Sequence, residues 1–103
     1  MEPNVEIIVG NREFWFKVVD FLQQNWALIE QPKGDDGCTV YFMGDTSLVF
    51  DRLSFSSPKD AEEALRRNGF ARFSDDEAAQ EFLAVPTAPY FEGSHPNGPI
   101  YSS

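Results

Sequence analysis

The segment that most constrains the fold is 57–73, SPKDAEEALRRNGFARF, because it carries the start and stop signals of one helix. Ser57 can accept a hydrogen bond from a free backbone N–H of the first turn, and Pro58 has no N–H to leave unpaired there. Acidic residues fill the early turns and two arginines fill the last, which matches the helix dipole. Gly69 suits a left-handed stop. These signals predict a helix over 58–68.

Extended segments surround this helix. Three β-rich runs separated by turn sequences lie within 26–55, and short turns between successive strands predict an antiparallel meander. Two more short runs, 5–9 (VEIIV) and 70–73 (FARF), are extended pieces that can lengthen this sheet. The runs of the meander are 26–31, 38–43 and 46–55.

Two further helices are predicted. Residues 12–25 carry two overlapping apolar stripes at helical spacing, which predict the longest helix of the chain, with a wide face packed against the sheet. Residues 75–83 follow Ser74 as a last short helix. The predicted fold class is therefore α+β: a small antiparallel sheet, the three-stranded meander 26–55, with two to three helices packed mainly on one face.

The 103 residues predict a single domain. Residues 1–85 are expected to form this compact α+β domain. Four of the seven prolines lie after Val85, so 86–103 is predicted to be a C-terminal tail rich in proline and glycine, either flexible or docked in extended form.

Charge limits the class of partner. The formal net charge is −9, and such a field repels the phosphates of nucleic acids and anionic membrane surfaces while favouring a basic protein partner. No apolar run approaches the ~18 residues that a membrane span needs. No signal peptide is visible, and a lone cysteine suits a reducing compartment, so a cytoplasmic location is expected.

Few residues could carry chemistry. One cysteine and one histidine cannot supply the four ligands of a structural zinc site, so no metal and no cofactor are predicted. Cys38 opens an apolar strand and His95 lies in the predicted tail, which disfavours a Cys–His catalytic pair. The sequence thus leans away from an enzyme.

Two hypotheses of function follow. The first is a small acidic intracellular interaction or accessory protein, not an enzyme, which docks a basic partner on an acidic helical face. The second is a small-ligand binder or enzyme with an aromatic pocket between helix 12–25 and the sheet. Burial of Asp51 among aromatic rings would favour the second; the simpler reading is that Asp51 points outward or pairs with an arginine such as Arg52 or Arg72. The acidic face comprises Asp60, Glu62, Glu63, Asp76, Glu77 and Glu81; the pocket comprises Trp15, Trp26, Tyr41 and Asp51.

Overall fold

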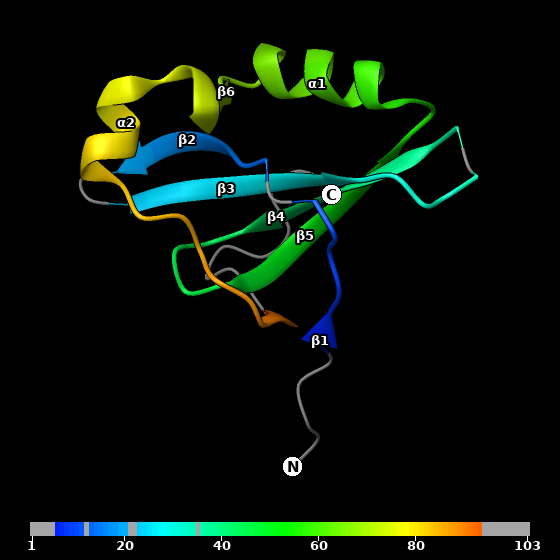
Figure 1. The fold of residues 1–103 in the computed structure, drawn as a ribbon, viewed down its shortest axis with the longest axis horizontal. Helices are drawn as coiled ribbons and strands as arrows, with labels where there is room; N and C mark the ends of the chain where they lie inside the picture. Colours follow the sequence, from blue (N-terminus) through cyan, green and yellow to red (C-terminus); the bar gives the residue numbers. More distant parts are fainter. Residues whose placement is uncertain (1–5, 12, 21–22, 35, 94–103) are drawn as a thin grey trace.

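The computed structural model describes residues 6–11, 13–20, 23–34 and 36–93, and over these the chain forms a seven-stranded mixed sheet with two α-helices (Figure 1). The strand order is β1-β7-β5-β4-β3-β2-β6. Neighbours are antiparallel except β5 and β7, which are parallel. The strands are β1 Glu6–Ile7, β2 Trp15–Asp20, β3 Gln23–Glu30, β4 Cys38–Met43, β5 Leu48–Phe55, β6 Ala71–Arg72 and β7 Tyr90–Glu92, and the helices are α1 Pro58–Arg67 and α2 Glu77–Phe82.

The predicted fold class is therefore wrong. Strands β3, β4 and β5 do pair as antiparallel neighbours, but they form the centre of a larger sheet instead of a small meander. The run 5–9 contributes β1, which pairs with β7, and the run 70–73 contributes β6, which pairs with β2. Neither run pairs directly with the meander, because β7 separates β1 from β5 and β2 separates β6 from β3.

The predicted helix 12–25 is the main error, since the described residues of this segment form β2 and the start of β3. Phe14, Trp15 and Phe16 are all buried, with Phe14 and Phe16 in one apolar cluster and Trp15 in another. Consecutive side chains of a strand point to opposite faces, so the first residues of β2 are covered on both sides, whereas Val18 and Val19 further along are exposed. The adjacent apolar residues that suggested a wide helical face thus face two different clusters.

The connection between β2 and β3 gave no sign of a turn. Only Phe21 and Leu22 separate the two strands, and neither is a residue type that marks turns. Both lie outside the described residues. Upstream, the Asn11 Oδ1 accepts a hydrogen bond from the Glu13 N–H at 2.9 Å, the kind of contact that caps a helix. This contact closes a turn before a strand, with no helix following it.

The sheet is covered on both faces by two separate apolar clusters. On β3, Trp26 and Leu28 point into the first cluster, while Ala27 and Ile29 point into the second. Helix α1 packs on the second cluster and α2 on the first, so the helices cover opposite faces, and the prediction of helices mainly on one face is wrong. The first cluster comprises Ile7, Val9, Phe14, Phe16, Trp26, Leu28, Met43, Val49, Ala79 and Tyr90, and the second comprises Trp15, Ala27, Ile29, Cys38, Val40, Phe42, Ala61, Leu65 and Phe70.

Helix α1 confirms the prediction for 58–68. The Ser57 side chain accepts from the Asp60 N–H at 3.2 Å, which caps the first turn. Gly69 has φ +87°, and its N–H bonds to the Arg66 carbonyl while the Phe70 N–H bonds to the Leu65 carbonyl. This pair of bonds is a Schellman motif, and Phe70 packs in the same cluster as Leu65, as that motif favours.

The chain after α1 crosses to the other face of the sheet. A 3₁₀ turn over Phe73–Asp75 leads into α2, which begins two residues later than the predicted helix 75–83 because Asp76 caps it, accepting from the Ala79 N–H at 2.9 Å. Beyond α2, β7 lies between β1 and β5, and Tyr90 is buried in the first cluster. The part of the predicted tail that the structure describes, 86–93, thus contributes a strand.

A side-chain contact ties the β4–β5 turn to β3. The Asp45 carboxylate accepts hydrogen bonds from the Trp26 indole N–H at 2.8 Å and from the Gln24 backbone N–H at 3.2 Å. Trp26 is fully buried, so its N–H depends on this partner.

Asp45→Ala should therefore lower the free energy of unfolding by about 1–2 kcal/mol, since it removes the charged acceptor of two hydrogen bonds. Urea titration followed by tryptophan fluorescence measures this change. Asp36→Ala, in an exposed loop, is the matched control and should leave the midpoint unchanged. Equal midpoints for the two variants would show that water replaces the Asp45 carboxylate at no cost.

Candidate functional site

The six residues of the predicted acidic face fall into two groups of three. Asp60, Glu62 and Glu63 lie on α1, whereas the other three, Asp76, Glu77 and Glu81, lie at or in α2, which covers the opposite face of the sheet. Three of the six have structural partners: Ser56 donates to Asp60, Arg72 pairs with Glu62, and Asp76 caps α2.

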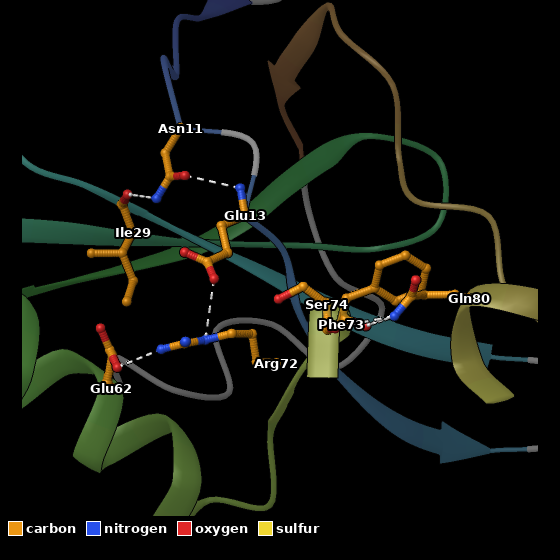
Figure 2. Close-up of polar contacts among 8 residues, drawn as sticks. All are labelled: Asn11, Glu13, Ile29, Glu62, Arg72, Phe73, Ser74 and Gln80. Atoms are coloured by element: carbon orange, nitrogen blue, oxygen red, sulfur yellow. Dashed lines mark hydrogen bonds and ion pairs between the residues drawn. The ribbon is translucent and has the colours of Figure 1, made fainter. Parts of the chain in front are cut away.

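Arg72 brings α1 together with the start of β2. Its Nη2 lies 2.8 Å from Glu62 Oε1, and its Nε lies 3.3 Å from Glu13 Oε1 (Figure 2). The contact between Arg72 Nε and Glu13 is an ion pair only, because the Nε–H is not aligned for a hydrogen bond. The guanidinium also lies 5.0 Å from the centre of the Trp15 ring, and Arg66 lies 4.9 Å from the same ring. One arginine thus holds two carboxylates over a buried indole.

A hollow of about 410 Å³ lies beside this contact, and Glu13 and Glu62, the two partners of Arg72, both line it. We call it the acidic hollow, since Glu13, Glu30 and Glu62 all line it. Its apolar lining comes from Trp15, Ile29 and Pro58, and its polar lining also includes Gly10, Asn11 and Gln31. The three carboxylates come from three separate parts of the chain, and only folding brings them together.

Backbone contacts fix the wall of the acidic hollow. Glu30 Oε2 accepts from the N–H groups of Gly10 at 3.2 Å and Asn11 at 3.4 Å. The Asn11 amide donates to the Ile29 carbonyl at 2.7 Å, as Figure 2 shows. Glu30 is therefore partly satisfied, whereas Glu13 and Glu62 share one arginine. Among the described residues of this site, the three carboxylates outnumber the two guanidinium groups beside Trp15, those of Arg72 and Arg66, which leaves a net negative charge.

The predicted aromatic pocket is not assembled. It required helix 12–25, which is absent from the described structure, and its residues divide between the two faces of the sheet. Trp26 and Tyr41 belong to the first cluster, whereas Trp15 belongs to the second. Asp51 is opposite Phe42 in the ladder, so it lies on the face of the second cluster.

Asp51 is buried, and its carboxylate accepts from the Arg52 backbone N–H at 2.8 Å. The Arg52 guanidinium instead pairs with Glu92 of β7 and lies 5.6 Å from the centre of the Tyr41 ring. The larger hollow, about 450 Å³, lies along β5 and β7 at these residues. Asp51 thus has a backbone partner, and it lies on the other face of the sheet from Trp26 and Tyr41.

Within the part of the chain that the structure describes, no group of three His, Cys, Asp or Glu side chains is placed to hold a metal ion. Cys38 is buried, and burial, with a smaller effect of Asp60, raises the pKa of its thiol, which makes it a poor nucleophile. His95 lies outside the described residues. In the same part of the chain, no helix has the length and apolar character to span a membrane.

Comparisons with known proteins add nothing to the geometry. No protein-family model matches the chain, no curated protein is significantly similar to it, and no solved structure matches its fold.

Sequence reasoning missed Glu13, Glu30 and Asn11. Glu13 falls in the predicted helix 12–25, Asn11 lies just before it, and Glu30 lies in the predicted strand 26–31. No local signal marks them, because only the pairing of β2 with β3 places the start of β2 beside the end of β3 and the first turns of α1.

Arg72→Lys should lower the free energy of unfolding by about 1 kcal/mol, because an ammonium group cannot bridge two carboxylates and lie flat over Trp15 at once. Arg67→Lys, at an exposed position of α1, is the matched control and should be neutral. Chemical denaturation of both variants tests this. If the two variants unfold at the same denaturant concentration, the Arg72 bridge contributes nothing to stability.

Cys38 should make stability fall at alkaline pH. Its pKa is raised on folding, so the folded thiol keeps its proton where the unfolded thiol loses it, above about pH 8.5. The stability that this provides is complete below that pH and is lost as pH rises through the folded pKa. Between pH 7 and 10 the free energy of unfolding should therefore fall more for the wild type than for Cys38→Ala. Parallel pH curves for the two proteins would contradict the shift.

Proposed function

We propose that this chain is a non-enzymatic interaction protein that binds a basic protein partner, and that the acidic hollow receives a lysine or arginine side chain of that partner. The observation that supports the proposal is the convergence of Glu13, Glu30 and Glu62 around one hollow of about 410 Å³. The net charge of −9 attracts such a partner and speeds the encounter.

The lining of the acidic hollow suits a long cationic side chain. Trp15, Ile29 and Pro58 offer apolar surface for the methylene stem, and the carboxylates offer acceptors for the charged end. Arg72 already makes the same kind of contact within the chain, with its guanidinium near Trp15 and paired to Glu13 and Glu62. A cation from the partner would meet the negative charge that Arg72 and Arg66 leave uncompensated.

We also propose an accessory role and a cytoplasmic location for the chain. The role rests on the net charge, and the location rests on the single, buried cysteine. Of the acidic helical face, only Glu62 belongs to the hollow, so the proposal moves the binding site from the outer faces of the helices to the junction of β2, β3 and α1.

A capped pentapeptide with two arginines tests the proposal. Titrated into the protein at low salt, it should shift the amide resonances of Gly10, Asn11 and Glu13, and the affinity should fall as salt is raised. The triple variant Glu13→Gln, Glu30→Gln, Glu62→Gln should bind roughly tenfold more weakly, because it removes the acceptors of the hollow.

The matched control removes the same number of charges elsewhere, with Glu63→Gln, Glu77→Gln and Glu81→Gln. This variant should bind the peptide within about twofold of the wild type. Equal weakening by both triple variants would show that binding follows net charge and that the hollow is no site. No salt-sensitive binding to the wild type would overturn the proposed function. Since Glu13 is half-exposed, Glu13→Gln alone serves if the triple variant does not fold.

A further inference from the structure

Apolar side chains lie exposed at the end of the sheet that β1, β7 and the start of β5 form. Ile8, directly after β1, is 76% exposed, and Leu48, the first residue of β5, is 37% exposed. Phe91 of β7 is partly buried and lies directly opposite Leu48 in the ladder. We call Ile8, Leu48 and Phe91 the edge patch.

The edge patch lies on the face of the sheet on which α1 packs, but away from that helix. Each residue of the patch is next in sequence to a residue of the first cluster, and consecutive side chains of a strand point to opposite faces. The neighbours in the first cluster are Ile7, Val49 and Tyr90. Helix α1 packs on β4 and β5, whereas β1 and the orange β7 lie at the bottom of Figure 1, far from α1 at the top. The helix that covers this face therefore does not reach the patch.

The chain after β7 starts against the edge patch. The Gly93 N–H donates to the Val49 carbonyl at 2.9 Å, so residue 93 still pairs with β5. A Cβ atom at position 93 would lie 2.9 Å from the Leu48 Cβ, which cannot move aside without its backbone, so only glycine fits there. Residues 94–103 therefore continue from a point in direct contact with the side chain of Leu48.

The sequence of 94–103 suits an apolar surface close to its start. It contains no Asp, Glu, Lys or Arg in a chain of net charge −9, and it carries two large apolar side chains, Ile100 and Tyr101. Pro96-Asn97-Gly98 is typical of a tight turn, because proline sets φ for the first central position and glycine suits the last. A reversal of the chain there brings Ile100 and Tyr101 back toward Gly93.

We propose that residues 94–103 fold back over the edge patch and cover it with Ile100 and Tyr101. Removing exposed apolar side chains from water is favourable, and a segment tethered at Gly93 meets the patch at a high effective concentration. A second copy of the chain is a weaker candidate for this place, since two molecules of net charge −9 repel each other. No residue of the patch lines the acidic hollow, so the inference does not depend on the proposed function.

Methyl nuclear magnetic resonance of the full chain tests the proposal. The Ile100 methyl groups should show nuclear Overhauser contacts to the methyl groups of Leu48 and Ile8, because such contacts arise only between protons that nearly touch. Val19, exposed on β2 near the other end of the sheet, is the control and should show none. A mixture of two differently labelled samples separates the occupants: contacts within one molecule support the proposal, and contacts only between molecules would assign the patch to a second copy instead.

Ile100→Ser combined with Tyr101→Ser removes the apolar cover. The methyl resonances of Leu48 and Ile8 should shift in this variant, while the far-ultraviolet circular dichroism stays that of the wild type because both apolar clusters are untouched. Ser102→Ala combined with Ser103→Ala is the matched control in the same segment and should leave those resonances in place. Absence of the Ile100 contacts in the wild type, or equal Leu48 and Ile8 resonances in the Ile100/Tyr101 variant and the wild type, would overturn the proposal.

Discussion

The structure depends on one strand that is buried on both faces. In β3, Trp26, Ala27 and Leu28 have no exposed surface and Ile29 has 7%. A fully buried side chain of leucine size contributes about 1.5–3 kcal/mol only if something covers it, so each face of this strand needs its own layer. Helix α1 covers one face, and the other is covered by β1, by α2 and by the chain that leads to β7. Phenylalanine and tryptophan supply the largest side chains of both cores, with Phe14, Phe16 and Trp26 in the first and Trp15, Phe42 and Phe70 in the second.

Local signals in the sequence were enough for the elements that depend on neighbours along the chain. Ser57, Gly69 and the residues between them predict α1, because capping and the left-handed stop act within a few residues. Residues 38–43 likewise predict β4 with its bounds, since the alternating pattern and the turns on either side are local. These elements need no information about what packs on them.

The errors come from residues whose role is set by distant parts of the chain. At the start of β2, Phe14, Trp15 and Phe16 form one apolar run in the sequence, but two different cores bury them. A single sequence cannot separate that pattern from the broad apolar face of a helix. The short strands β1, β6 and β7 have two or three residues each, and only pairing with remote partners identifies them as strands.

The same limit applies to the candidate site. The charge of the chain predicts a basic partner, and the acidic helical face includes Glu62. Glu13 and Glu30 lie near Glu62 only because β3 runs antiparallel to β2, which places Glu13, just before β2, beside the end of β3. Arg72 then sets the position of two of the carboxylates that line the hollow. It pairs with both Glu13 and Glu62 and so holds these two carboxylates in place beside the hollow. An internal cation thus positions the carboxylates and leaves part of their charge for an external one.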